Sequence, residues 1–237
     1  MSFIYLIRHG QAGTRDNYDT LSEIGHQQAR LLGEHLAAQQ VEFAAVISGS
    51  LNRQRRTAEI ACEAMARAGA NVPDITTDER WNEFSLLSVY KSIARRLMKA
   101  DEQFARDVVE MQEAIRRDPH TTAGATGRCD QAVIRAWMEN RFPDLEVEES
   151  YERFRTRIHS CADTFKGHEP AIAVFTSATP IAIHAGAALA LTNDKLISIL
   201  GVIYNTSVTV LRMKNDDLRL FTFNSVAHLD AATRTLR

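Results

Sequence analysis

Short apolar runs alternate with helical patterns along this chain, and this alternation constrains its fold more than any other feature. The runs have the length of β-strands, and the first three lack polar alternation, which is typical of strands buried on both faces of a sheet. Segments with helical spacing of apolar residues lie between them, as in a parallel sheet covered by helices on both sides. The sequence therefore predicts an α/β fold with a mostly parallel, doubly covered sheet. The expected strands are residues 3–7, 44–47, 171–175, 207–211 and 218–223.

Helices are expected after the first three strands. Ser22 has a side chain suited to cap the first of them. A second helix is expected from about Arg53 to Ala68, and a third from Pro180, because proline suits the first turn of a helix. The first helix is expected to direct Ile24, Leu31, Leu32 and Leu36 toward the core.

Residues 85–149 follow a different pattern, with helical spacing and no apolar strand. A break rich in Thr, Gly and Ala is expected at residues 119–129, and a second helical segment follows around Trp137. We therefore expect an α/β core, residues 1–84 and 150–237, and a helical cap, residues 85–149. The cap would lie over the carboxyl edge of the sheet, where α/β proteins bind their ligands. Its apolar positions before the break are Ile93, Leu97, Phe104, Val108, Met111 and Ile115.

Charge and cysteine content exclude several classes of protein. The chain has 237 residues and a formal net charge of −2. A protein that binds nucleic acid or anionic membranes by general electrostatics needs a basic excess, so neither partner is expected. The cysteines, Cys62, Cys129 and Cys161, are far apart and lack metal-ligand spacing. This usage favours reduced thiols in a cytoplasmic protein.

Residues 171–191 carry no Asp, Glu, Lys or Arg over about the length of a membrane-spanning helix. Lipid would leave the polar groups in the middle of this segment unsatisfied. A buried strand, a polar turn and a buried helix explain the segment better. The residues in question are Thr176, Ser177, Thr179, Pro180 and His184.

Polar residues follow the first two expected strands. Arg8 and His9 end the first strand, although taken alone they fit a surface pair better than a site. Arg53 stands at the start of the helix after the second strand, where a positive charge opposes the helix dipole unless an anion is bound. The pattern around Arg53 therefore indicates an anion-binding site. Arg55 and Arg56 are expected on a solvated face.

Several motifs, in this order, resemble the histidine phosphatase superfamily, the phosphoglycerate-mutase-like family. They cover both ends and the middle of the α/β core, and only residues 85–148 lack support. The motifs are Arg8-His9-Gly10-Gln11, the stretch at residues 21–29, Ser50-Leu51-Asn52-Arg53 with Thr57-Ala58, Glu83, Glu149-Ser150-Tyr151 with Arg157, Asn205-Thr206-Ser207, and Asn224 with His228.

The resemblance implies a reaction as well as a fold. In this family a histidine, His9 by position, attacks a phosphoryl group and forms a phosphohistidine that water hydrolyses. Arg8 and Arg53 would clamp the phosphoryl oxygens with guanidinium donors, and Glu83 would protonate the leaving alcohol. No metal and no cofactor is implied. The expected reaction is hydrolysis of phosphomonoesters, on a phosphorylated small molecule or a phosphoprotein.

Ser177 departs from the family pattern. The family places a second histidine after the strand that corresponds to residues 171–175, and Ser177 stands in that position. A serine hydroxyl can donate to a phosphoryl oxygen but carries no charge, and losing a charge-assisted donor costs about 2–4 kcal/mol in a transition state. Ser177 is therefore expected to bind phosphate, and the enzyme is expected to be slow, to use another cation in place of the histidine, or to have lost its activity. His184 lies about two turns further along and is expected to be a packed helix histidine.

Two other functions remain open. A phosphoglycerate mutase is disfavoured because Arg15 stands where the mutase pattern has an asparagine. A phospholigand-binding or interaction module that has lost turnover is favoured by Ser177. No oligomeric state follows from the sequence.

A basic cluster in the cap has two interpretations. A solvated helix face is favoured, and the alternative is a contact to a substrate carboxylate or a second phosphate. The cluster consists of Lys91, Arg95, Arg96 and Lys99.

Overall fold

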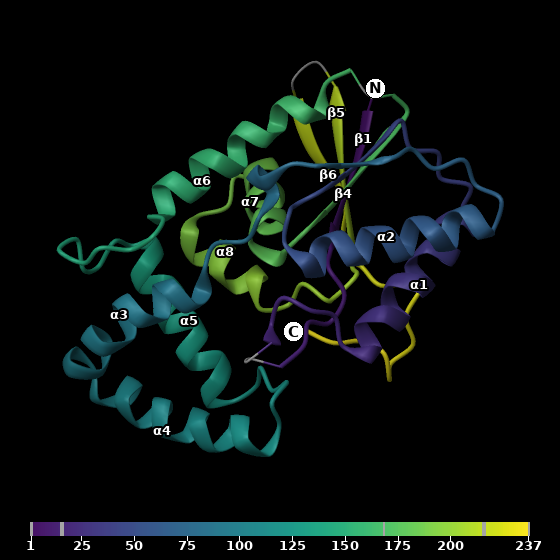
Figure 1. Cartoon of the computed structure of the whole chain (residues 1–237). Helices are drawn as coiled ribbons and strands as arrows, with labels where there is room; N and C mark the ends of the chain where they lie inside the picture. Colours follow the sequence, from purple (N-terminus) through teal and green to yellow (C-terminus); the bar gives the residue numbers. More distant parts are fainter. Residues whose placement is uncertain (1, 15–16, 168, 215–216, 237) are drawn as a thin grey trace.

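The computed structural model describes residues 2–14, 17–167, 169–214 and 217–236, which form a six-stranded mixed sheet with helices on both faces (Figure 1). The strand order is β3-β2-β4-β1-β5-β6. The predicted α/β class and mostly parallel sheet are confirmed. Four strands pair in parallel: β1 (Ser2–Arg8), β2 (Ala45–Ser48), β3 (Ile75–Thr77) and β4 (Ala171–Thr176). β5 (Val208–Lys214) pairs antiparallel with both of its neighbours, β1 and β6 (Asp217–Ser225), so β6 runs in the same direction as β1.

The central strands bury their side chains in two separate cores, one on each face of the sheet. In β1, Ile4 and Leu6 belong to one apolar cluster and Ile7 belongs to the other. In β4, Val174 belongs to the first cluster and Ala173 to the second. Because successive side chains point to opposite faces, strands buried on both sides lack polar alternation.

Helices from different parts of the chain cover the two faces. α1 (Glu23–Ala38) and α2 (Asn52–Arg67) pack on the face that includes Ile7, and α6 (Tyr151–Ser160) and α7 (Ala178–Ala188) pack on the other. The remaining elements of the core are α8 (Asn193–Leu200), which contacts α7, and the short 3-10 helices η2 (Glu79–Trp81) and η3 (Cys161–Phe165).

The segment between β3 and α6 contains α3 (Leu86–Ala100), α4 (Glu102–Arg117) and α5 (Ala125–Met138). Asp101 separates the first two helices, because its carboxylate accepts a hydrogen bond from the backbone N of Phe104 (3.0 Å) and caps α4. The apolar spacing continues across this junction, so the periodicity alone does not indicate two helices. The predicted break at residues 119–129 is too long, since α5 already begins after Gly124, which has a φ of +60°.

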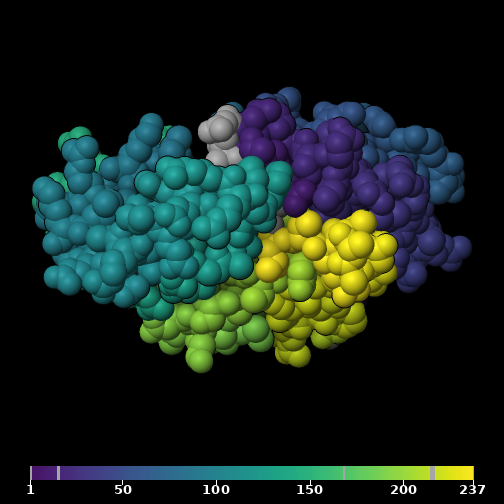
Figure 2. Space-filling view, turned by 90° about the horizontal axis from the view of Figure 1, so that it is seen from below, coloured from purple at the N-terminus to yellow at the C-terminus, as the bar shows by residue number. Residues whose placement is uncertain are grey.

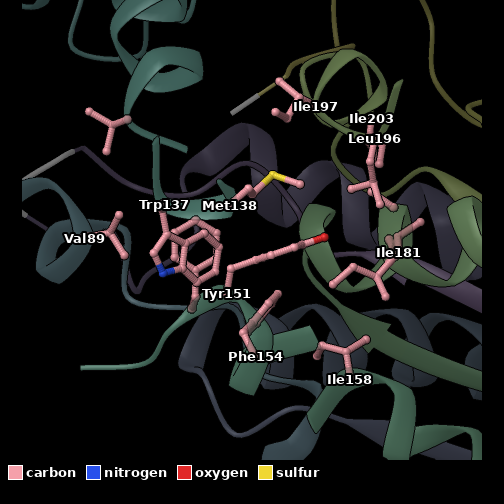
Figure 3. Packing of buried hydrophobic residues seen from close by; sticks show 14 of the residues in the cluster. Val89, Trp137, Met138, Tyr151, Phe154, Ile158, Ile181, Leu196, Ile197 and Ile203 are labelled. Atoms are coloured by element: carbon pink, nitrogen blue, oxygen red, sulfur yellow. The ribbon is translucent and has the colours of Figure 1, made fainter. Parts of the chain in front are cut away.

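One continuous apolar cluster joins these helices to the core (Figure 3). Trp137 of α5 is central to it. Its indole stacks on Phe84 at 4.3 Å between ring centroids, and its Nε1 donates to the backbone oxygen of Glu149 (2.9 Å). Tyr151 and Phe154 of α6 contact the same indole at 5.3 and 5.6 Å. Figure 3 shows the rings of Trp137, Tyr151 and Phe154 in the same cluster as Val89, Met138, Ile158, Ile181, Leu196, Ile197 and Ile203.

The buried face of α1 differs from the expected one. Ser22 caps the helix as predicted, by accepting from the backbone N of Gly25 (3.0 Å). Ile24, however, is 38% exposed, because it lies one position off the buried stripe, and Leu31 is only half-buried. The buried stripe contains two glycines and a glutamine, so a pattern of apolar residues alone does not identify it. The stripe consists of Gly25, Gln28, Ala29, Leu32, Gly33 and Leu36.

Residues 171–191 form β4, a turn at Ser177 and α7, which is buried on nearly all sides. The helix begins at Ala178, slightly earlier than expected, so that Pro180 lies in its first turn. Within the described ranges, no helix has both the length and the apolar character needed to cross a membrane.

Gly33 allows α1 and α2 to pack closely, and its replacement tests this contact. A Cβ atom at this position would lie 2.2 Å from the backbone oxygen of Ala61. Helix propensity alone predicts that Gly33→Ala stabilises the protein by about 1 kcal/mol, whereas steric overlap predicts a loss of about 1–3 kcal/mol. We expect the loss, measured as the free energy of unfolding in urea.

Gln27→Ala on the exposed face of the same helix is the matched control. It should change the free energy of unfolding by less than about 0.5 kcal/mol. A Gly33→Ala protein as stable as the parent would contradict the close packing of the two helices.

Candidate active site

His9 lies one residue beyond the end of β1 and is 1% exposed. Its Nδ1 is 2.7 Å from the backbone oxygen of Gly10. Because a carbonyl oxygen only accepts, Nδ1 carries the ring proton and Nε2 keeps its lone pair. Burial, and then the charges of Arg53 and Arg8, hold the pKa of His9 well below its usual range. The ring is therefore neutral at pH 7.

Arg53 approaches the free nitrogen of this ring from the first turn of α2. Its Nε donates to His9 Nε2 over 3.3 Å, and its Nη1 donates to the carboxylate of Asp19 (2.8 Å). The same carboxylate accepts from the backbone N of Asn52 (3.1 Å), and the guanidinium lies 4.8 Å from the ring centroid of Tyr18. A carboxylate thus stands at the N-terminus of α2, where the helix dipole and Arg53 both attract an anion.

Arg8 ends β1 and is 6% exposed. Its Nη1 donates to the backbone oxygens of Ile203 and of Leu236, the latter at 2.9 Å. Its Nε is buried and has no partner among the described residues. Burial lowers the pKa of Arg8, whereas Tyr18 and Glu83 raise it. Arg8 therefore keeps an unused N–H donor.

Glu83 reaches the same region after β3 and η2. Its carboxylate accepts from the backbone N of Thr179 (3.1 Å) and of Phe84 (3.2 Å). Burial raises the pKa of Glu83 above its usual value, although Thr179 and the charge of Arg53 act in the opposite direction. A carboxyl group with a raised pKa is suited to donate a proton near neutral pH.

Arg157 holds the backbone that precedes Glu83. Its guanidinium pairs with both carboxylate oxygens of Glu149, at 2.9 and 2.7 Å. It also donates to the backbone oxygens of Arg80 (2.8 Å) and Asn82 (3.0 Å). The Arg157 side chain from α6 therefore fixes the loop that carries the carboxyl group.

Ser177 follows β4 and is 1% exposed. β1 and β4 run parallel with Arg8 opposite Thr176, so His9 and Ser177 are the next residues at the ends of two neighbouring strands. The Ser177 hydroxyl accepts from the side-chain amide of Gln54 (2.9 Å).

The structure brings the predicted site residues to one edge of the sheet. Three hydrogen bonds link the elements that carry them. Arg53 of α2 donates to His9, and Gln54 of α2 donates to Ser177. The backbone N of Thr179, in the first turn of α7, donates to Glu83. Figure 2 views this end of the molecule, where the teal helices of the insertion lie beside the purple N-terminal and yellow C-terminal segments. The residues brought together are Arg8, His9, Arg53, Glu83 and Ser177.

His184 lies outside this group. Its ring packs against Trp81 and Phe165, with centroids 5.2 and 5.1 Å away. Burial lowers its pKa to about 3, with a smaller effect of His159. The prediction of a packed helix histidine is confirmed.

The other basic residues are found mostly at the surface. Arg55 and Arg56 are exposed on α2, as predicted. Arg96 of the cap pairs with Asp144 (2.7 Å), and both partners are largely exposed. Lys91, Arg95 and Lys99 are exposed as well, which agrees with a solvated face. Arg15 lies outside the described residues.

Sequence reasoning missed several residues that contact the site. Gln54 was passed over although it directly follows Arg53. Tyr18 and Asp19 lie in a loop with no periodic pattern, so nothing in the sequence marked them. Asn205 was recognised only as part of a motif, and its side-chain amide donates to the backbone oxygen of His9 (3.1 Å).

The ring of His9 should remain neutral well below pH 6.5, the usual pKa of a histidine. Burial is the main cause, so Arg53→Gln should raise the pKa of His9 without bringing it to 6.5. Ring ¹⁵N chemical shifts followed by NMR against pH measure both values and identify the protonated nitrogen. Arg55→Gln, on the exposed side of α2, is the control and should leave the titration unchanged. A parent His9 that titrates at or above pH 6.5 would refute this account of the site.

Comparison with known proteins adds a family to this geometry. A family model described as the histidine phosphatase superfamily (branch 1) matches residues 4–133 and 118–226. A protein of Citrobacter koseri named "Probable phosphoglycerate mutase GpmB" is 26% identical over 177 residues. That alignment spans 70% of this chain and 66% of the relative, just under two thirds of its length.

Solved structures share the fold. A phosphoglycerate mutase from Bacillus anthracis superposes with a TM-score of 0.60 at 16% identity, over 96% of this chain and 94% of that chain. A mutant phosphoserine phosphatase from Entamoeba histolytica, in complex with phosphoserine, superposes with a TM-score of 0.59 at 14% identity. The superposition covers 97% of this chain and 100% of that chain. Both phosphatases and mutases thus lie among the structural neighbours. The chain belongs to the histidine phosphatase superfamily.

Proposed function

We propose that this protein is a metal-independent phosphatase that hydrolyses phosphomonoesters through a phosphohistidine at His9. The observation that carries the proposal is the neutral imidazole of His9, whose unprotonated Nε2 lies 3.3 Å from Arg53 Nε. A buried nitrogen nucleophile beside two buried guanidinium groups is suited to attack a phosphoryl dianion. The substrate is a phosphorylated small molecule or a phosphoprotein in the cytoplasm.

The first step transfers the phosphoryl group to the protein. The oxygens of the phosphoryl group accept hydrogen bonds from Arg53 and Arg8. Arg53 Nε then no longer donates to His9 Nε2, and the lone pair of this nitrogen becomes available. The lone pair on Nε2 forms a bond to phosphorus while the ester P–O bond breaks and leaves its electron pair on the departing oxygen. Glu83, whose pKa is raised by burial, gives a proton to that oxygen when the carboxyl group is protonated.

The second step returns the protein to its starting state. The carboxylate of Glu83 takes a proton from a water molecule as the water oxygen bonds to phosphorus. The P–N bond breaks, its electron pair returns to His9 Nε2, and phosphate leaves. The two arginines stabilise the charge on the phosphoryl oxygens in both steps, which is most of what phosphoryl transfer requires.

Ser177 makes this phosphatase a slow one. The hydroxyl can donate a single uncharged hydrogen bond, whereas a histidine in this position would donate from a charged ring. The same observation favours the second candidate function, a phospholigand-binding or interaction module without turnover. Assay of an aryl phosphate separates the two, because the module would bind phosphate and release no product.

A mutase of the same family would pass the phosphoryl group from His9 to a second hydroxyl group rather than to water. Supplying phosphoglycerate and analysing the products distinguishes this alternative, since a mutase yields an isomer and a phosphatase yields free phosphate.

His9 is expected to be essential for turnover. A mixture with a labelled phosphate ester, quenched rapidly, should contain an acid-labile phosphoenzyme, and His9→Ala should remove both the label and the activity. Arg53→Ala should lose nearly as much, and the double variant should be no worse than His9→Ala, because the clamp and the nucleophile act as a unit. Chelators should leave the parent's activity intact.

Arg56→Ala, on the exposed side of α2, serves as the control for this experiment. Full turnover in His9→Ala would exclude His9 as the nucleophile. Activity that disappears with a chelator and returns with a metal ion would exclude the metal-independent reaction.

Glu83→Gln should reveal the proton donor through the leaving group. A glutamine keeps the shape and cannot protonate the departing oxygen. Hydrolysis of an alkyl phosphate, whose leaving alkoxide is strongly basic, should fall by about 10²–10⁴-fold, and hydrolysis of an aryl phosphate with an acidic phenol should fall much less. Activity of the parent should decline as the pH rises through the raised pKa of Glu83, because the donor is lost there. Equal losses on both substrates would contradict this role.

A further inference from the structure

The hydroxyl of Ser177 is fully enclosed by protein, yet it has only one hydrogen-bond partner among the described residues. It accepts from the Nε2 of Gln54 at 2.9 Å. It is at the N-cap position of α7 but makes no capping bond. Ser177 therefore has a hydroxyl proton that no described group accepts.

The orientation of the Gln54 side chain is fixed by a second contact. Nε2 also donates to the backbone oxygen of Trp81 at 3.2 Å. That oxygen can only accept, so the amide nitrogen and not the amide oxygen must face it. The same nitrogen faces Ser177, so Ser177 is the acceptor in that contact, and its own proton points elsewhere.

The surroundings of Gln54 show that this arrangement costs free energy. Gln54 is 0% exposed, and its Oε1 is buried without a partner among the described residues. A Cβ atom at position 49 would lie 2.0 Å from that oxygen, so the carboxamide fits only because residue 49 is Gly49. An unpaired buried oxygen is unfavourable, and native proteins accept such costs mostly at functional sites.

Ser177 stands at the edge of the sheet that carries His9, Arg53 and Glu83. Ser177 and His9 end neighbouring parallel strands, and the residue before Gln54 is Arg53, which contacts His9. Glu83 is held by the backbone N of Thr179, two residues after Ser177. A phosphoryl group attacked by His9 would therefore be within reach of the Ser177 hydroxyl.

We propose that Gln54 is a positioning residue that makes Ser177 a phosphoryl donor. The amide of Gln54 donates to the oxygen of the Ser177 hydroxyl. The proton of that hydroxyl can then be donated to a phosphoryl oxygen. Gln54 touches no substrate atom itself and acts only through Ser177. This inference rests on the proposed function, because it assumes that a phosphoryl group binds next to His9.

The test is a double-mutant cycle between Gln54 and Ser177, read as kcat and KM for an aryl phosphate. Ser177→Ala removes the donor, and Gln54→Met keeps the size of the side chain while removing the amide. Each single variant should lower kcat/KM by about tenfold, mainly in kcat. The double variant should be within about twofold of Ser177→Ala, because Gln54 has nothing left to position.

Thr176→Val is the matched control. The Thr176 hydroxyl donates to the same backbone oxygen of Trp81 (2.6 Å) and does not contact the Ser177 side chain. If Gln54→Met acted only by loosening that backbone, Thr176→Val would reduce activity similarly. We expect Thr176→Val to change kcat by less than twofold and Gln54→Met to unfold at a temperature close to that of the parent.

Two outcomes overturn the inference. One is full activity in Gln54→Met together with a loss in Ser177→Ala. The other is a double variant whose loss equals the product of the two single losses, because Gln54 would then act independently of Ser177.

A second measurement uses the unmodified protein and separates this inference from the proposed function. In a crystal structure with orthovanadate, Ser177 Oγ should be within hydrogen-bond distance of a vanadate oxygen while Gln54 Nε2 remains on Ser177. A vanadate that lacks this contact overturns the inference whatever the variants do. If the protein binds vanadate but releases no product, the proposed function fails, and the same cycle read as vanadate affinity decides the role of Gln54. A protein that does neither overturns both.

Discussion

Two guanidinium groups and an imidazole are buried together at the carboxyl edge of the sheet, and the rest of the site depends on this concentration of charge. Buried charge is unfavourable unless hydrogen bonds or counter-charges compensate it. The chain supplies these from distant segments: the backbone oxygens of Ile203 and Leu236 reach Arg8, and Asp19 reaches Arg53. Burial and these two charges lower the pKa of His9 and keep its ring neutral. A phosphoryl dianion compensates two guanidinium groups better than carbonyl oxygens do, and this difference is the physical basis of the proposed phosphate site.

The position of Glu83 depends on a different part of the molecule. Glu83 lies between the loop held by Arg157 and Phe84, which stacks on Trp137 of α5 at 4.3 Å. The insertion is therefore packed directly against the residue that follows the carboxyl group. Close packing of these aromatic rings limits the freedom of the backbone at Phe84 and therefore at Glu83. The position of Glu83 therefore depends on the insertion and on α6, whereas His9 and Arg53 are positioned by the sheet and by α2.

The strands that could be predicted are those whose burial on both faces requires apolar side chains at successive positions. β1 and β4 lie between two apolar cores, and their continuous apolar runs identified them without ambiguity. β3 was missed because it is a three-residue edge strand with one apolar side chain, Ile75, whose pairing comes from its neighbour β2. The positions of His9 and Arg53 were predictable from strand ends and helix polarity. The contacts of Asp19 and Gln54 were not, since they depend on a loop conformation and on one amide orientation that no periodicity encodes.

Ser177 and Gln54 also explain why a single exchange at either position cannot recreate the family pattern. The amide of Gln54 is 2.9 Å from the Ser177 hydroxyl and is itself fully buried, so the volume beyond that hydroxyl is filled. An imidazole ring extends well past the position of a serine Oγ and would overlap the carboxamide, and overpacking of a closed interior is costly. Gly49 completes the set, because only a glycine leaves room for the carboxamide oxygen. Residues 49, 54 and 177 therefore form one steric unit, in which the side chain of Gln54 fills the space between Gly49 and Ser177.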